Sequence, residues 1–245
     1  MLQLKNIKYT ANDDGKDIDI INGLDLSIDD GKFVVITGPN GGGKSTLAKV
    51  IMGINPVSQG NIIFDGEDIT KLSITERAKK GISFAFQQPV RFKGIMVYDL
   101  LRLASGTKLS ISEACEYLSK VGLCARDYIN REVNDSLSGG ELKRIEIATV
   151  LARGTKFTIF DEPEAGIDLW SFQNLIKVFE NIRTSINGTI LIISHQERIL
   201  NIADEIVIIE NGKVKKQGPK DEILPEIIGS PFAANACNKL EQEGK

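Results

Sequence analysis

The sequence contains no apolar run that approaches the roughly 20 residues a membrane-spanning helix requires. Its first ten residues, MLQLKNIKYT, contain neither an apolar block nor a small-residue cleavage site, so no export signal is visible. The 30 basic and 33 acidic residues leave a net charge of -3, which does not favour binding to nucleic acid. We therefore expect a cytoplasmic protein that has no nucleic-acid partner and does not insert directly into a membrane.

Cysteine is scarce as well, with only Cys115, Cys124 and Cys237 in 245 residues. The three form no C-x-x-C pair and their number is odd, which is typical of reduced thiols in the cytoplasm. A sulfur or metal role for any of them is left open. With 42% hydrophobic residues, a chain of this length can bury a core without disulfides or metals.

The pattern of apolar residues alternates between strands and helices. Residues 32–37, KFVVIT, form a nearly continuous β-branched run, typical of a strand buried on both faces. Residues 2–9 and 24–28 alternate as half-buried strands, with an Asn- and Asp-rich turn between them. Between about residues 96 and 153 the pattern predicts three helices and no strand. We expect an α/β fold with a mostly parallel sheet, an antiparallel β edge and a helical subdomain.

The predicted organisation is a single domain over residues 1–245. It comprises a nucleotide-binding body (1–87 and 154–224), a helical subdomain (88–153) and a C-terminal tail (225–245).

The strongest motif is GPNGGGKST at residues 38–46, which fits G-x-x-x-x-G-K-[ST] between a buried strand and a helix. Glycines let the backbone wrap closely around phosphates, and the helix N-terminus attracts their negative charge. Lys44 is predicted to reach the outer phosphates and Ser45 to bind Mg²⁺. A plain Gly-rich turn is the alternative, which the flanking strand and helix disfavour. The predicted ATP-binding residues of this loop are Gly38, Pro39, Asn40, Gly41, Gly42, Gly43, Lys44, Ser45 and Thr46.

Two acidic residues follow the strand-like segment KFTIF at residues 156–160. They stand at the carboxyl end of a buried strand, where ligands bind in such sheets. Asp161 is predicted to hold Mg²⁺ through water, and Glu162 to orient or deprotonate an attacking water. Solvated acids at a strand end are the alternative, but the phosphate loop favours the catalytic interpretation.

Two further strand ends carry polar side chains. His195 is the one histidine of the chain and follows a buried strand that we expect beside the one ending in Asp161. A contact to the γ-phosphate is predicted, and a structural histidine is the alternative. The amide of Gln87, after FAF at residues 84–86, could reach Mg²⁺ or water, although Gln-Gln-Pro is also a plain exit from a strand.

The segment LSGGELKRIEI at residues 137–147 suggests a second phosphate loop, because Ser138, Gly139 and Gly140 precede a helix. One chain already has a phosphate site at its Gly-rich loop. A second one makes sense if it closes over the nucleotide of another copy. The sequence therefore predicts an ATP-dependent head-to-tail homodimer that sandwiches two ATP molecules.

Together these motifs resemble those of the ATP-binding-cassette (ABC) ATPases, over almost the whole chain to about residue 218. In that family's terms, Walker A is 38–46, the signature is 137–141 and Walker B ends at Asp161–Glu162. The resemblance implies an ATPase that uses Mg²⁺ and converts ATP and water to ADP and phosphate. It also implies that Tyr9 stacks on adenine. The residues implied to contact the partner copy's ATP are Ser138, Gly139, Gly140, Glu141 and Asp168.

Within that family, four segments resemble SufC, the cytosolic ATPase of the Suf iron–sulfur cluster assembly system. They are the signature with its SGGE-x-KR-x-EI pattern, AGID at 165–168, GISFAFQQPV at 81–90 and HQERIL at 195–200. The chain departs from SufC in a shorter stretch between Gln87 and Ser138, and in Glu164-Ala165 where SufC has Asp-Ser. The resemblance implies a SufB-like scaffold partner, alone or with a SufD-like one. The partner's conformation would change when ATP drives dimerisation.

Three other functions are alternatives to this one. The ATP-binding subunit of an ABC membrane transporter would perform the same chemistry and differ in what its helical subdomain contacts. A chromosome or repair ATPase would need a long coiled-coil insertion, and no heptad run exists here. A nucleotide-binding module without turnover would lack the base, whereas Glu162 is present. We favour the SufC-like interpretation. The partner's identity, the resting oligomeric state and the dependence of turnover on the partner stay open.

Overall fold

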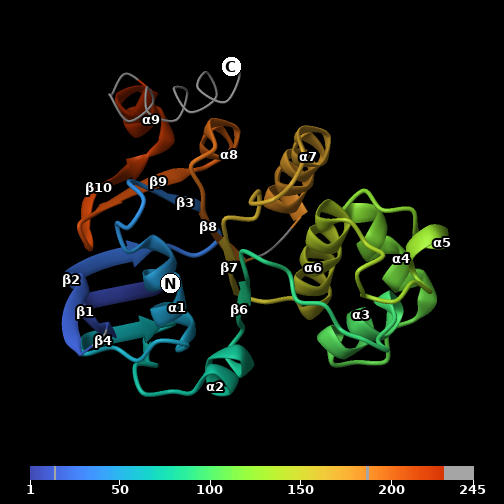
Figure 1. The fold of residues 1–245 in the computed structure, drawn as a ribbon, viewed down its shortest axis with the longest axis horizontal. Coiled ribbons are helices and arrows are strands. Elements are labelled where there is room, and N and C mark those ends of the chain that lie inside the picture. The colour runs from blue at the N-terminus through green and yellow to red at the C-terminus, as the bar shows by residue number, and fades with distance from the viewer. Residues whose placement is uncertain (14, 186–187, 229–245) are drawn as a thin grey trace. The chain divides into compact units, whose positions relative to one another are not determined.

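The computed structural model describes residues 1–13, 15–185 and 188–228 (Figure 1). The chain forms two compact units, one from Met1–Lys71 with His195–Lys245 and one from Leu72–Ser194. Among the described residues, no helix combines the length and the apolar character needed to span a membrane. The predicted boundaries of the body, the helical subdomain and the tail stay a prediction. Residues 229–245, including Cys237, lie outside the described part.

The first unit contains an antiparallel sheet with strand order β2-β1-β4-β5. Alternate residues such as Leu2, Leu4 and Leu26 point into the core and are at most 3% exposed, as the half-buried pattern predicted. The strands are β1 (Leu2–Asp13), β2 (Lys16–Ile28), β4 (Gln59–Phe64) and β5 (Glu67–Asp68).

The long turn predicted between β1 and β2 is wrong, because the two strands stay paired as far as Asp13 and Lys16. Polar side chains bridge this part of the hairpin. Thr10 Oγ1 donates to Asp19 at 2.7 Å, and Asn12 Nδ2 donates to Asp17 at 2.8 Å. Asn12 and Asp17, which suggested a turn, thus form a cross-strand pair, and such pairs stabilise a ladder.

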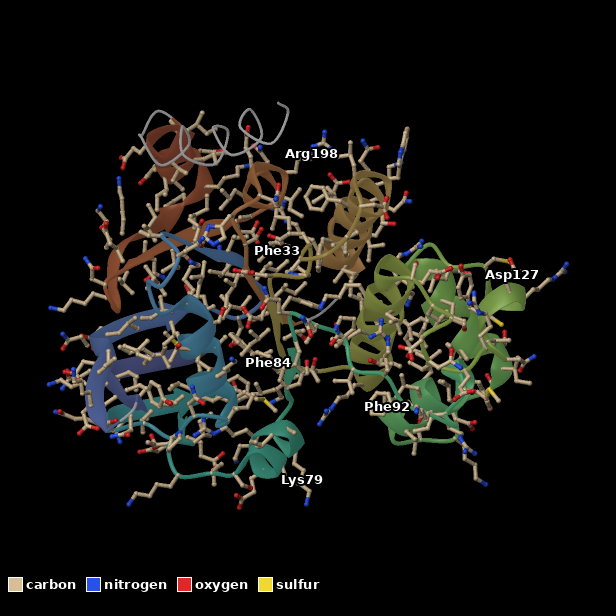
Figure 2. All side chains as sticks on the ribbon, in the orientation of Figure 1. Phe33, Lys79, Phe84, Phe92, Asp127 and Arg198 are labelled. Atoms are coloured by element: carbon tan, nitrogen blue, oxygen red, sulfur yellow. The ribbon has the colours of Figure 1, made fainter. Side chains whose placement is uncertain are left out.

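The first unit also contains the strands that position the Gly-rich loop. β3 (Phe33–Thr37) is buried at all five residues, and Phe33 is labelled in Figure 2. It pairs in parallel with β9 (Glu205–Glu210), and β10 (Lys213–Pro219) pairs antiparallel with β9. This arrangement confirms the fully buried strand and the edge strand predicted from the sequence.

Three helices belong to this unit. They are α1 (Lys44–Met52), α8 (Glu197–Asn201) and α9 (Lys220–Ile228). α1 ends at Gly53 with φ 81°, a left-handed conformation that favours glycine at a helix C-cap. α9 runs through Pro225, where the predicted C-terminal tail begins. Burial of Ile223 and Leu224 accompanies this helix, and Asp221 and Glu222 occupy its first turn, where acidic side chains are favourable.

The second unit is built on a parallel sheet with β8, β7 and β6 in that order. β7 and β8 are buried at every residue, as expected for parallel strands covered on both faces. The strands are β6 (Ile82–Ala85), β7 (Phe157–Asp161) and β8 (Thr189–Ile193).

Three helices of the second unit, α2, α4 and α6, begin at well-formed N-caps. Ser73, Ser110 and Ser138 each form a capping box with the glutamate three residues on. The three helices predicted between 96 and 153 are present, with the short α5 as a fourth. The helices are α2 (Ile74–Lys79), α3 (Val97–Ser105), α4 (Ile111–Lys120), α5 (Ala125–Tyr128), α6 (Gly139–Arg153) and α7 (Leu169–Ser185).

Packing of α7 on β7 gives a test of the core. Phe179 is 0% exposed and meets Phe160 edge-on at 5.2 Å between ring centroids. We expect Phe179→Ala to lower the free energy of unfolding by about 3–5 kcal/mol in urea denaturation, because it leaves a cavity. Leu103→Ala is the control, since Leu103 is 65% exposed and should change the value by about 0.5 kcal/mol at most. Equal effects of the two variants would contradict this packing.

Candidate functional site

The Gly-rich loop between β3 and α1 runs very close to neighbouring backbone. Gly38 has φ 134°, and a Cβ on it would lie 2.0 Å from the carbonyl oxygen of Ile209 in β9. Gly43 has φ 97°, and a Cβ there would lie 3.0 Å from the carbonyl oxygen of Ile20 in β2. Only glycine fits such a path without displacing backbone. The close approach of neighbouring backbone thus gives a structural reason for glycine at these two positions, beside the predicted binding of phosphate.

Lys44 is directed into this loop. Its side chain donates to the carbonyl oxygens of Gly38 at 2.9 Å and Pro39 at 2.8 Å, and the residue is only 5% exposed. A backbone hydrogen bond also fixes the loop, because the Gly212 N–H donates to the Gly42 carbonyl at 3.1 Å. An ammonium held by carbonyls in a loop that opens a helix suits an anionic ligand, since both the charge and the helix N-terminus favour phosphate.

The other predicted ligands of the first unit lie on regular elements. Ser45 and Thr46 occupy the first turn of α1, which carries no acidic residue in that turn. Tyr9 lies in β1 opposite Ile21 and is half-buried. Stacking of Tyr9 on adenine stays a prediction.

The second unit brings Gln87 and Glu162 together, although 75 residues separate them. Gln87 Nε2 donates to Glu162 Oε2 at 2.7 Å. Glu162 follows β7 with φ 44°, an unusual conformation for a residue with a side chain, and its N–H donates to Ile193 at 3.0 Å. Strained backbone of this kind is found most often at functional sites. Asp161, just before it, is 4% exposed.

The chemistry of the predicted donors fits Mg²⁺, which prefers oxygen ligands. Ser45 offers a hydroxyl and Asp161 a buried carboxylate at the end of its strand. Gln87 uses its amide nitrogen for Glu162, so its amide oxygen is the atom suited to a cation. Ser45 belongs to the first unit and Asp161 and Gln87 to the second, and their binding of one ion stays a prediction.

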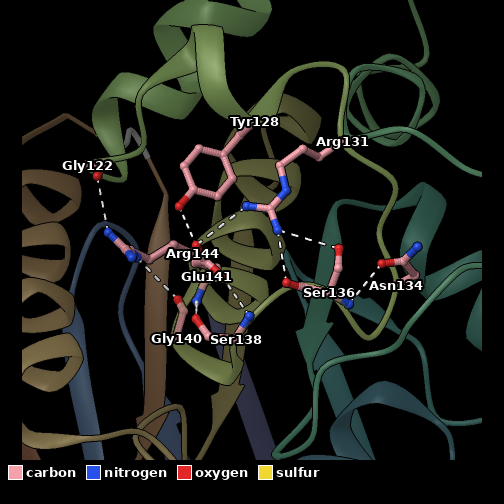
Figure 3. A network of polar contacts seen from close by, with 9 residues as sticks. All are labelled: Gly122, Tyr128, Arg131, Asn134, Ser136, Ser138, Gly140, Glu141 and Arg144. Carbon is pink, nitrogen blue, oxygen red and sulfur yellow. Dashed lines mark hydrogen bonds and ion pairs between the residues drawn. The ribbon is translucent and has the colours of Figure 1, made fainter.

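The signature segment is held by a polar network that the sequence did not predict (Figure 3). The Ser138 N–H donates to Glu141 Oε2 at 2.7 Å, and the Glu141 N–H returns to Ser138 Oγ at 3.3 Å. The other oxygen of Glu141 accepts from the Tyr128 hydroxyl and lies 3.8 Å from Arg131. Arg144 donates to the Gly140 carbonyl at 3.2 Å.

This network limits which groups of the signature can meet a phosphate. The Ser138 amide is already bound by Glu141, so the hydroxyl of Ser138 and the amides of Gly139 and Gly140 are the donors suited to an anion. Burial opposes ionisation of Glu141, but the hydrogen bonds from Tyr128 and Ser138 outweigh it and lower the pKa of this carboxyl. The same bond raises the pKa of Tyr128. Glu141 is therefore a carboxylate that fixes the start of α6.

An ion pair in α6, between Lys143 and Glu146, contacts the Gln87 backbone through Lys143. The sequence did not predict that this pair belongs to the site. The sequence signal was present, namely two charged residues three apart among the apolar positions of a helix. It could not be interpreted without knowing what the helix packs against.

Comparison with known proteins identifies the family. The family model described as ABC transporter matches residues 21–165, more than half of the chain. The chain belongs to the ABC-type ATPases. It is an ATPase, and the predicted P-loop NTPase fold of the ABC type is confirmed, with its mixed sheet, antiparallel β part and helices.

Individual relatives agree with this family assignment. An uncharacterised ABC transporter ATP-binding protein of Methanocaldococcus jannaschii is 38% identical over 213 residues, covering 84% of this chain and 85% of that protein. The probable ATP-dependent transporter ycf16 of Pyropia yezoensis is 36% identical over 214 residues, covering 81% and 85%.

A solved ATP-binding cassette, dimeric in a post-hydrolysis state with ADP and phosphate, has a TM-score of 0.79 at 23% identity. The match covers 90% of this chain and 99% of that one. At this identity the comparison shows the fold alone.

In this ABC-type ATPase, His195 follows β8, which pairs with β7 as the sequence predicted. The residue as a whole is exposed, yet partial burial of the imidazole lowers its pKa, and the positive charge of Lys44 lowers it further. At neutral pH the ring is therefore neutral. Its contact with the γ-phosphate stays a prediction.

The titration of His195 tests its place near the phosphates. In ¹H NMR without nucleotide, we expect a pKa below the ordinary 6.5, since burial and Lys44 both oppose protonation. Because the folded-state pKa is depressed, protonation of His195 reduces stability as the pH falls below about 6.5. A non-hydrolysable ATP analogue should raise the pKa through its negative charge.

The sequence holds one histidine, so its resonance needs no assignment by mutation. ADP is the control, and it should raise the pKa less than the analogue does. Equal shifts with both nucleotides would contradict a contact to the γ-phosphate.

Proposed function

We propose that this ATPase is SufC-like and drives conformational change of a SufB-like scaffold in cytoplasmic iron–sulfur cluster assembly. The observation that carries the proposal is the signature segment. It has Glu141 in place of the last residue of LSGGQ, with Lys143 and Glu146 after it, whereas transporter signatures usually continue with Gln-Arg. Each of these three side chains has specific partners in the fold. In this proposal the SufB-like scaffold acts alone or with a SufD-like protein.

The proposed contact surface for the scaffold lies after Gln87. Val90, Phe92 and Met96 expose 50%, 37% and 41% of their area, and Phe92 is labelled in Figure 2. The segment is held in place by its backbone, because the Phe92 N–H donates to Val133 at 2.9 Å. A fixed segment that presents apolar side chains suits a protein partner, which would bury them.

In the proposed mechanism, the loop of residues 38–46 and Lys44 bind the phosphates of ATP. Glu162, held by Gln87, takes a proton from the water that attacks the γ-phosphorus. The bond between that phosphorus and the bridging oxygen breaks, which releases ADP and phosphate. Mg²⁺ would neutralise charge on the phosphates. Neutral His195 is suited to donate a hydrogen bond to the γ-phosphate.

We further propose that two chains form an ATP-dependent head-to-tail dimer. Within the second unit, Gly140 packs against Ser171, since a Cβ on Gly140 would lie 2.7 Å from the Ser171 hydroxyl. The signature and the segment around Asp168 therefore form one continuous surface. Donors of this surface, the Ser138 hydroxyl with the amides of Gly139 and Gly140, would contact the partner's ATP, with Glu141 supporting them.

The alternative is the ATP-binding subunit of an ABC membrane transporter. It is favoured by the names of the two relatives described above, both of which mention a transporter. The chemistry would be the same, and the surface after Gln87 would receive a segment of a membrane protein.

A pull-down of the tagged full-length chain from its own cell lysate separates the two functions. Without detergent, we expect a soluble SufB-like scaffold by mass spectrometry, and replacing Phe92 with Asp should reduce its recovery at least tenfold. Ile111→Asp is the control, because Ile111 is also exposed, at 63%, but lies on α4. Recovery of a multi-spanning protein, and only from solubilised membranes, would instead establish the transporter function.

The proposed dimer is tested with Glu162→Gln, which should bind ATP, hydrolyse it at least 100-fold more slowly and accumulate as a dimer in gel filtration. Trp170 reports on the same event, because it is the one tryptophan of the sequence and is 77% exposed two residues after Asp168. We expect its emission to shift to shorter wavelength with ATP and to stay unchanged with ADP. A variant that binds ATP and remains monomeric would contradict the sandwich.

A further inference from the structure

An ion pair is buried inside the second unit, on helix α6. The Lys143 and Glu146 side chains are 1% and 16% exposed, and Lys143 Nζ lies 3.0 Å from Glu146 Oε2. The same ammonium donates to the carbonyl oxygens of Phe86 and Gln87, the latter at 3.3 Å. Its three N–H groups therefore have three acceptors, two of which belong to the segment that leaves β6.

Glu146 completes the grip on that segment. Its second oxygen accepts the Phe86 N–H at 3.2 Å. The pair thus binds both the N–H and the C=O of Phe86, one residue before Gln87. Two side chains from one turn of α6 fix the backbone at the point where the chain leaves the sheet.

Stability alone does not account for this pair. Removing a lysine and a glutamate from water is costly, and well-packed apolar residues often replace such pairs without loss. The cost is visible at Glu146, because burial raises its pKa while Lys143 only partly offsets the effect. What an apolar pair would lack is the ability to bind the polar backbone of Phe86 and Gln87.

Fixing the Phe86 backbone also fixes the next residue, Gln87. Gln87 donates from its side chain to Glu162 at 2.7 Å. A series of hydrogen bonds thus runs from α6, through the backbone of Phe86 and Gln87, to the carboxylate expected to act as the base. α6 itself begins at the signature, with Ser138 as its N-cap.

We propose that Lys143 and Glu146 are positioning residues for hydrolysis, which hold Gln87 so that it orients the Glu162 carboxylate. A displacement of α6, when the signature meets the second nucleotide, would reach Glu162 through the same bonds. The inference rests on the proposed roles of Gln87 and Glu162 in ATP hydrolysis.

The test is a double-mutant cycle on the full-length protein, measured as steady-state hydrolysis of MgATP. Lys143→Met keeps the length of the side chain and removes the ammonium, and we expect kcat to fall about 10- to 100-fold with KM changed less than twofold. Gln87→Ala should lower kcat by a similar factor. The two changes together should cost no more than the larger of the single effects, because Lys143 acts through Gln87.

Three further variants guard the interpretation. Glu146→Gln, combined with Gln87→Ala in the same way, replaces Lys143→Met if that variant does not fold. Lys143→Arg keeps the positive charge and should restore part of kcat. Arg153→Met removes a charge from the end of the same helix, where Arg153 donates to Ala78 at 3.1 Å, and should leave kcat unchanged.

Each outcome decides a different claim. If the factors for Lys143→Met and Gln87→Ala multiply in the double variant, Lys143 acts independently and the positioning inference is overturned alone. If Gln87→Ala leaves kcat unchanged, the proposed role of Gln87 fails together with the inference. A rise in KM at constant kcat for Lys143→Met would also overturn it, because the residue would then act on substrate binding.

Discussion

Fully buried strands leave no room for charged side chains, which can appear only where a strand ends. The chemistry of this ATPase depends on that constraint. β3, β7 and β8 are buried along their whole length, so they can carry only apolar or hydrogen-bonded side chains within the sheet. Charged and amide side chains appear directly after them, where the backbone turns away. The Gly-rich loop follows β3, Glu162 follows β7, and Gln87 leaves β6 in the same way.

The geometry at these strand ends is costly and is held by its surroundings. Glu162 adopts φ 44°, and the Gly38 backbone passes Ile209 so closely that no side chain would fit. Such conformations persist only where neighbouring contacts fix them. Here the contacts are backbone hydrogen bonds: the Glu162 N–H donates to the Ile193 carbonyl, and the Gly212 N–H donates to the Gly42 carbonyl. Each of these two segments is therefore pre-organised within its own unit, which reduces the cost of ordering it when a ligand binds.

Two lysines are buried for different reasons. Lys44 is bound by carbonyl oxygens of the loop that it is expected to share with phosphate, so a ligand can replace its partners. Lys143 donates to the Glu146 carboxylate and to the carbonyl oxygens of Phe86 and Gln87. These partners all belong to the protein itself, which indicates a structural role. The contrast supports two separate roles, in which Lys44 binds substrate and Lys143 maintains the geometry of the proposed base, Glu162. The same signature segment that resembles SufC supplies Lys143, Glu141 and Glu146.

The sequence by itself determined the local features. The spacing of Gly38–Thr46 between a strand and a helix, the buried strands and the helices of residues 97–153 follow from short-range patterns, and the fold confirms them. The extent of the first hairpin did not follow, because Asn and Asp serve both turns and cross-strand pairs. Only the tertiary structure decided which distant groups meet. Gln87 reaches Glu162 across 75 residues, and Lys143 reaches Phe86 across 57. Such pairs leave no periodic signal, since they arise from the packing of α6 and the neighbouring strands rather than from the local path of the chain.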